Sequence, residues 1–190
     1  MNTSTYMINT EKCGDIAHQL KILWYKYAEW MRMYIISKIS ESNDINHTLN
    51  RLYRTPAEFA ALLKKYCKVK TAKAFEELFT YHLLTAVELA DDLKSQNIKT
   101  ADKTRRKWYT NADELACILS DINPGYSKHE WRAMLYDHLF MTEREMILRI
   151  ACKYEEEILE YENIIFQAGR IADMMSEEII KYNSYEIIQL

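Results

Sequence analysis

The chain has 190 residues, of which 48% are hydrophobic and 28% charged, and its formal net charge is −3. This length suits one domain with a substantial core. Dedicated nucleic-acid and anionic-membrane binders usually carry a surplus of Lys and Arg, so we expect neither nucleic acid nor a membrane as a partner. The sequence has no apolar run of the roughly 18 residues that a membrane-spanning helix needs and no signal-peptide pattern, so we expect a soluble, cytoplasmic protein.

Helix breakers are scarce, because the whole chain contains three glycines and two prolines, while Leu, Ile, Met, Ala, Glu and Lys fill long stretches. This composition predicts an all-α fold. The four cysteines lie far apart and form no CxxC pair, which favours free, buried thiols in a reducing compartment over disulfides or zinc ligation. They are Cys13, Cys67, Cys117 and Cys152.

We expect residues 1–12 to form a loose, polar N-terminal segment and residues 13–190 to form a single helical-bundle domain. Apolar residues recur at three- and four-residue spacing from 15 to 40, which predicts the first long helix. A polar stretch ends this helix, and a short helix over 46–53 follows it.

The next helix has a clear start signal at Thr55, which stands before a proline and three residues before Glu58. This pattern predicts an N-cap followed by a helix to about residue 66. Asn111 and Glu114 show a similar cap pattern later in the chain. We therefore expect short capped helices in the connections between the long ones.

The chain contains an internal repeat, in which residues 52–84 align without a gap with residues 108–140, at an offset of 56. A repeat at a fixed offset predicts that one helical arrangement is used twice. The identical positions are Tyr53/Tyr109, Glu58/Glu114, Ala60/Ala116, Leu63/Leu119, His82/His138 and Leu83/Leu139.

The repeat sets the bounds of the remaining long helices. One begins near Thr71 and ends near residue 95, and Thr100 can cap the segment after it. Its counterpart begins at Ser127, where a glutamate three residues later completes a capping box. The offset then predicts a break near 152–153, and the last helix runs to about residue 182. The expected architecture is an antiparallel bundle of four long helices with short capped connecting helices.

One polar residue falls on the apolar stripe of each long helix: Tyr27, His82, His138 and Gln167. Imidazoles on facing helices are a common way to build a metal site in a bundle. In that interpretation His82 and His138 ligate a divalent transition metal, and Tyr27, Gln167 or Glu145 completes the ligand shell. The alternative is a hydrogen-bonded polar layer that sets the helix register without a ligand.

The polar layer is favoured, because the ExxH spacing of di-iron bundles is absent. Both interpretations predict that His82 and His138 are buried and lie within one water or one ion of each other. As a purely structural group, His82 should be replaceable by leucine at little cost. Other charged groups are expected at the surface, with the basic residues 103–107 in solvent and Asp173 paired with Arg170.

A wider set of residues, spread over positions 20–180, resembles a family of small uncharacterised proteins of clostridia and bacilli, some of which are labelled acetylglutamate kinase. The resemblance implies that most members have a histidine at the position of Tyr27 and share Gln167, and it implies no activity. Inward histidines in a four-helix body are also similar to ferritin-like and DinB-like bundles. The residues that carry the resemblance include Leu23-Trp24, Trp30, Arg51-Leu52, Phe75-Glu76-Glu77-Leu78, His82-Leu83, Trp108-Tyr109, Asn111-Ala112-Asp113-Glu114, Asn123-Pro124, Met134-Leu135-Tyr136-Asp137-His138-Leu139 and Ala172-Asp173.

The sequence contains no glycine-rich phosphate loop and no nucleophile motif that would identify an enzyme. The favoured hypothesis is a non-enzymatic binding or structural protein, which forms a homo-oligomer through its aromatic-rich surface or through residues 183–190. The alternative hypothesis is a metal-binding bundle, including a metal-dependent enzyme, that uses the two histidines. Neither hypothesis identifies a small-molecule ligand.

Overall fold

The computed structural model describes residues 3–122 and 125–188, and the side chains within 15–122 and 125–177. In these ranges the chain is helical and has no β-strand, which confirms the all-α fold class. The helices are α1 (Thr3–Ile39), α2 (Ile45–Leu52), α3 (Thr55–Leu63), α4 (Val69–Lys94), α5 (Ile98–Ile122), α6 (Lys128–Ile150) and α7 (Tyr154–Ile188).

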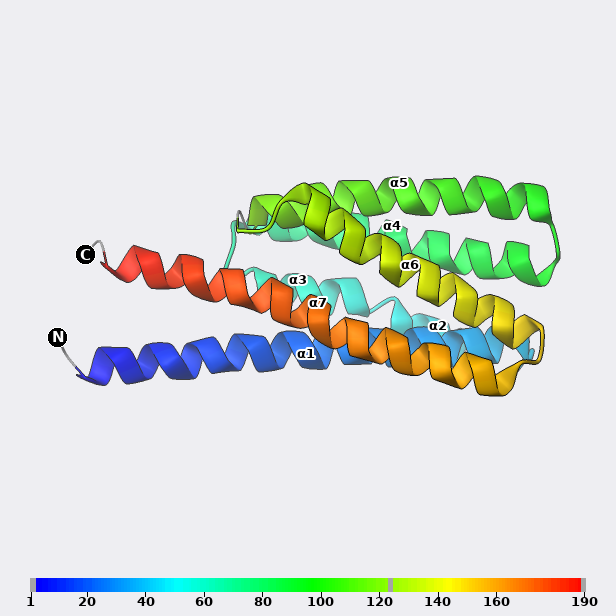
Figure 1. Ribbon diagram of the computed structural model, residues 1–190, viewed down its shortest axis with the longest axis horizontal. Coiled ribbons are helices and arrows are strands. Elements are labelled where there is room, and N and C mark those ends of the chain that lie inside the picture. The colour runs from blue at the N-terminus through cyan, green and yellow to red at the C-terminus, as the bar shows by residue number, and fades with distance from the viewer. Residues whose placement is uncertain (1–2, 123–124, 189–190) are drawn as a thin grey trace.

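The long helices pack as neighbours in the order α4, α5, α6, α7 and α1, while α3 packs against α1 and α4, and α2 packs against α1 (Figure 1). The start of α1 and the end of α7 lie at the same end of the molecule (Figure 1). Because α5 is itself long, the described part of the chain has five long helices rather than the four expected.

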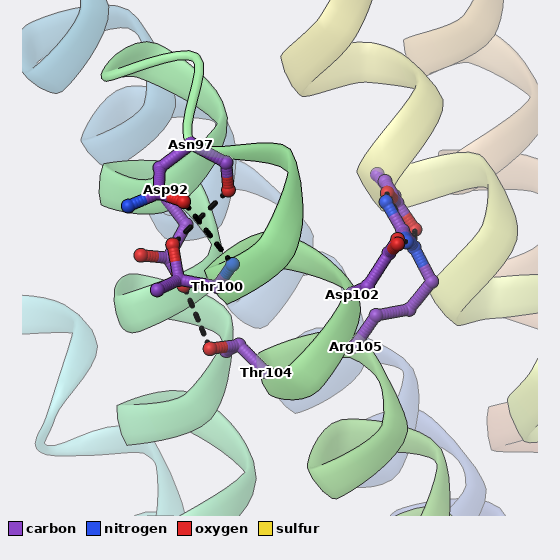
Figure 2. Close-up of polar contacts among 7 residues, drawn as sticks. Asp92, Asn97, Thr100, Asp102, Thr104 and Arg105 are labelled. Carbon is purple, nitrogen blue, oxygen red and sulfur yellow. Dashed lines mark hydrogen bonds and ion pairs between the residues drawn. The ribbon is translucent and has the colours of Figure 1, made fainter.

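The length of α5 shows that Asn111 is not a helix cap. It lies in the interior of α5, where its side chain is buried. Asn is a good cap residue because its side chain can bond to nearby backbone, but here the amide is used by another helix. The start of α5 is instead marked by Asn97, whose side-chain oxygen accepts a hydrogen bond from the backbone N–H of Thr100 at 3.3 Å (Figure 2).

Three other predicted helix starts also differ. Thr55 is the first residue of α3 rather than its cap, its hydroxyl is buried without a hydrogen-bond partner among the described residues, and α3 ends at Leu63. Helix α4 begins at Val69, before the expected Thr71, and α1 begins at Thr3, inside the segment expected to be loose. The capping box at Ser127 is confirmed, because its side chain and that of Glu130 exchange hydrogen bonds with each other's backbone.

The predicted break near residue 152 is confirmed, although neither glycine nor proline marks it. Helix α6 ends at Ile150, and Cys152 has a positive φ of 56°. The turn between α4 and α5 has the same form 56 residues earlier, where Gln96 also has a φ of 56°. A positive φ is uncommon for a residue with a side chain, so these two turns share a specific geometry.

An aromatic cluster fills the centre of the bundle. Trp24 and Tyr27 of α1 meet Phe59 of α3 and Phe79 of α4 in edge-to-face contacts. Such contacts add to the free energy that burial of the rings contributes. Helices α1 and α7 approach closely at Gly169, where a Cβ atom would lie 2.8 Å from the hydroxyl of Tyr25.

Three of the four cysteines are not the buried thiols that the sequence suggested. Cys67 is half-buried, Cys117 and Cys152 are exposed, and all three are free. Cys67 and Cys152 lie in the connections that follow α3 and α6, and Cys117 lies on α5. The side chain of Cys13 lies outside the described residues.

Several surface charges have partners on neighbouring helices. Asp173 pairs with Lys21 of α1 at 2.8 Å instead of with Arg170, because α1 lies alongside α7. Arg105 binds Glu143 of α6 and also pairs with its own neighbour Asp102 (Figure 2). The basic stretch 103–107 is therefore partly committed to ion pairs. No helix in the described part of the chain is both long and apolar enough to cross a bilayer.

Candidate functional site

His82 of α4 is 2% exposed, and both of its ring nitrogens have protein partners. Nδ1 lies 2.8 Å from Oδ1 of Asn111, and Nε1 of Trp108 donates a hydrogen bond to Nε2 at 3.1 Å. Because an indole N–H can only donate, Nε2 must accept and Nδ1 carries the proton. Burial lowers the pKa of His82 to about 3, so the ring is neutral.

The amide of Asn111 continues the network back to α4. Its Nδ2 atom donates to the backbone carbonyl of Leu78 at 3.1 Å. Because Nδ2 donates there, the amide oxygen is the atom left to accept from His82. The three polar side chains of His82, Asn111 and Trp108 therefore connect α4 and α5 through buried hydrogen bonds.

His138 of α6 makes the corresponding contacts with α7. Its Nδ1 lies 3.0 Å from Oε1 of Gln167, and Nε2 of Gln167 donates to the backbone carbonyl of Met134 at 3.2 Å. These three residues stand 56 positions after His82, Asn111 and Leu78, which make the same two contacts between α4 and α5. Burial lowers the pKa of His138 to about 4.

The two histidines differ at Nε2. The counterpart of Trp108 on α7 is Ile164, which has no hydrogen-bond donor in its side chain. His138 instead faces Tyr27, with 5.4 Å between the ring centroids. The hydroxyl of Tyr27 and the indole N–H of Trp24 are buried and have no hydrogen-bond partner among the described residues. Burial also raises the pKa of Tyr27 well above its usual range.

His82, His138, Tyr27 and Trp24 all border one small internal cavity, whose other walls are apolar. Its volume is about 10 Å³, which is the space needed for roughly one water molecule. The expectation that both histidines are buried is confirmed, and both line this one cavity. Gln167 reaches this layer through His138 and is itself buried.

Glu145 was the remaining ligand candidate, and it does not border this cavity. It is buried at the junction of α6, α7 and α1, where Arg32 binds both Glu145 at 2.8 Å and Glu157 at 2.5 Å. Burial raises the pKa of Glu145 to about 7, although the nearby Arg32 opposes this shift. Arg149 lies 3.5 Å from Glu157 and supplies a second positive charge.

The geometry offers little to a metal ion that binds through both histidines. A ligand imidazole needs a nitrogen with a free lone pair, and in His82 the only such nitrogen accepts from Trp108. Among the residues whose side chains the structure describes, no three His, Cys, Asp or Glu converge as a metal site requires. Metal binding with His82 and His138 as the first ligands stays a prediction, and the hydrogen bond from Trp108 to His82 weighs against it.

The sequence pattern missed Asn111, Trp108 and Arg32 as parts of these buried networks. The repeat contained the signal for Asn111, since the offset of 56 residues places it at Gln167, which was recognised as an inward polar residue. Arg32 has no such signal, because its partners lie more than 100 residues away. No protein-family model, curated protein or solved structure matches this chain.

Proposed function

We propose that this is a non-enzymatic structural or binding protein that self-associates, and that its two histidines are structural groups. The observation that carries the proposal is the complete set of partners around His82, with Nδ1 bound to Asn111 and Nε2 to Trp108. A general base or a metal ligand needs an available lone pair, and this histidine has none.

The buried networks explain why histidines are present without a reaction to catalyse. Each hydrogen bond forms in one register of the two helices that it joins. A shift of α5 along α4 leaves the polar atoms of His82 and Asn111 buried and unpaired, at about 1–3 kcal/mol for each group. Polar layers of this kind select one packing arrangement among several that are equally apolar.

The surface supports self-association. Large apolar side chains are exposed on the outer faces of α6 and α7, and they include Phe140, Ile147, Leu159 and Phe166. Contiguous exposed apolar patches are uncommon on monomers and usually mark an interaction site. We place the protein in the cytoplasm, which agrees with the free thiols of Cys67, Cys117 and Cys152.

Two measurements test this proposal on the full chain purified without a histidine tag. Light scattering over a range of protein concentrations should give a mass above that of the monomer, and elemental analysis should find no stoichiometric transition metal. A monomer at every concentration contradicts the self-association. Near-stoichiometric metal that is lost in His138→Leu contradicts the structural role of the histidines.

The alternative function, ligand or metal binding in the bundle core, is favoured by one observation at the second histidine. Tyr27 and Trp24 have buried polar atoms that find no partner among the described residues, and both side chains line the cavity of about 10 Å³ with His138. A single water or ion would satisfy them. The resemblance to the clostridial and bacillar family remains a proposal beside it, and a histidine at position 27, as that resemblance implies, would add a nitrogen ligand here.

A further inference from the structure

A shallow groove lies on the outer surface between α6 and α7, with a volume of about 370 Å³. Phe140 of α6 and Phe166 of α7 stand at its edges, with 59% and 72% of their surfaces exposed. Asp137 and Arg170 border the same groove. The groove therefore combines two exposed aromatic rings with one acidic and one basic side chain.

The two charged groups of the groove have no ion-pair partner in the part of the chain whose side chains the structure describes. Neither Asp137 nor Arg170 forms an ion pair among the residues that the structure describes, and Asp173, the expected partner of Arg170, is bound by Lys21. The groove is thus electrically neutral as a whole, with an unpaired charge of each sign.

The corresponding surface between α4 and α5 is different. The counterpart of Phe166 is Thr110. Nearby, Glu88 of α4 and Lys107 of α5 form an ion pair at 3.0 Å, so these two charges have partners within the same chain. On the α4–α5 surface the counterparts of Asp137 and Phe140 are Tyr81 and Leu84, which are exposed, so that surface has apolar side chains beside the Glu88–Lys107 ion pair. The difference between the two surfaces is the second aromatic ring, Phe166 in place of Thr110, and the charges of Asp137 and Arg170, which have no ion-pair partner among the described residues.

We propose that the α6–α7 groove is the surface at which two copies of this chain pack about a twofold axis. The proposal rests on the self-association proposed above and names the surface that mediates it. In a twofold dimer each residue of the patch meets the same patch on the other copy. Asp137 of one copy then lies against Arg170 of the other, and this pair forms twice. Phe166 of each copy enters the groove of the other.

The first test replaces the most exposed aromatic side chain. Phe166→Glu should raise the dimer dissociation constant at least about tenfold, because a buried aromatic anchor is replaced by a charge. Ile98→Glu is the matched control, because Ile98 lies on α5 and is 77% exposed. Sedimentation velocity gives the dissociation constants, and circular dichroism shows that both variants remain folded. Equal weakening by the two variants overturns the proposal.

The second test reverses the two charges of the groove. It distinguishes a second copy of this chain from any other partner at the groove. Asp137→Arg alone should weaken the dimer, because two pairs of arginines face each other, and Arg170→Asp alone should do so through paired aspartates. An equimolar mixture of the two variants should restore association close to that of the wild type, because every contact in the mixed dimer is again between opposite charges.

The outcomes distinguish failure of this surface from failure of self-association. If the wild-type chain is a monomer at all concentrations, both proposals are wrong. If the wild-type chain associates and the mixture does not recover, the surface is wrong and self-association stands. Loss of binding to a different macromolecule in Phe166→Glu, with an unchanged dimer, assigns the groove to that partner and overturns the proposal.

Discussion

The two histidine sites use the same pair of hydrogen bonds at an offset of 56 residues but differ in their surroundings. Nε2 of His82 accepts a hydrogen bond from Trp108. At the corresponding position beside His138 stands Ile164, and the ring of His138 faces Tyr27. The comparison teaches that the hydrogen bond from histidine to a side-chain amide is the common structural device. The environment of the second nitrogen is the part that varies.

The two halves differ again where α1 packs on them. Glu145 and Glu157 form a buried cluster with Arg32, while the positions 56 residues earlier are Leu89 and Ala101, which are buried and apolar. The same helix positions therefore accept either apolar or ionic contacts. Which kind of contact forms depends on what the neighbouring helix supplies, and here α1 supplies a guanidinium.

The largest expected effect is at this ionic cluster. Arg32→Met leaves two buried carboxylates without their common partner and should lower the free energy of unfolding by about 3–5 kcal/mol. Chemical denaturation at pH 7 measures it. Lys21→Met is the matched control, because its ion pair with Asp173 is substantially exposed, and it should cost at most about 1 kcal/mol.

The comparison of the halves can be sharpened at the same site. The triple variant Arg32→Met, Glu145→Leu, Glu157→Ala gives α6 and α7 the residues that α4 and α5 carry. Because replacement of a whole buried ion cluster by apolar groups is often neutral or stabilising, it should recover most of the stability lost in Arg32→Met. A triple variant less stable than Arg32→Met would contradict this prediction, because apolar residues would then be unable to replace the ionic cluster.

The next largest effect separates the two histidines. His82→Leu leaves Asn111 and Trp108 each with a buried, unpaired polar atom, so the free energy of unfolding should fall by about 2–4 kcal/mol. His138→Leu leaves only Gln167 and should cost about 1–3 kcal/mol. From the sequence alone, His82→Leu was expected to cost little stability. The hydrogen bonds of His82 to both Asn111 and Trp108 change that expectation. Equal losses in the two variants would contradict the role assigned to Trp108.

The histidines also predict how stability depends on pH. Their pKa values are lowered in the folded protein from 6.5 to about 3 and about 4, so the unfolded chain binds protons first. Their stabilising contribution is complete above pH 6.5 and is lost as the pH falls towards those values. The loss is about 1.4 kcal/mol for each histidine and each pH unit.

Glu145 acts in the opposite direction, because its pKa is raised in the folded protein from 4.5 to about 7. The stabilising contribution of Glu145 is complete below pH 4.5 and is lost as the pH rises through 7.

Removing one of the two histidines tests these pH effects. Between pH 6.5 and 5, the free energy of unfolding should depend less steeply on pH in His82→Leu than in the wild type, because one group with a lowered pKa is gone. A slope in His82→Leu as steep as that of the wild type would remove the assignment to His82.

The sequence predicted the features that depend on local spacing. The capping box at Ser127 and the break at Cys152 were found from neighbouring residues and the repeat, and the inward direction of His82 and His138 followed from helical periodicity. Each of these features is determined within a few helical turns. The structure of the described residues agrees with them for that reason.

The features that the sequence did not predict depend on contacts between distant segments. Asn111 has the side chain of a cap residue, and only the position of His82 on the neighbouring helix gives it an acceptor role inside α5. The pairing of Arg32 with Glu145 spans 113 residues, and no local pattern distinguishes it from a surface charge. For the same reason the sequence pairs Asp173 with Arg170, whereas its partner in the structure is Lys21 of α1.

The smallest expected effect on stability is at Tyr27, beside His138. The hydroxyl of Tyr27 is buried beside His138 without a hydrogen-bond partner among the described residues. If the bundle core is purely structural, Tyr27→Phe removes a desolvated polar group. The free energy of unfolding should then stay the same or rise by about 1 kcal/mol.

Tyr136→Phe is the matched control, because the hydroxyl of Tyr136 donates a hydrogen bond to Asp113 at 3.1 Å. Its removal should lower the free energy of unfolding by about 0.5–1.5 kcal/mol. A loss of that size in Tyr27→Phe would mean that its hydroxyl is held in the folded protein by a water or an ion at the cavity with His138. Dialysis against a chelator separates the two, because chelation removes the difference between Tyr27→Phe and the wild type only where the bound species is a metal ion.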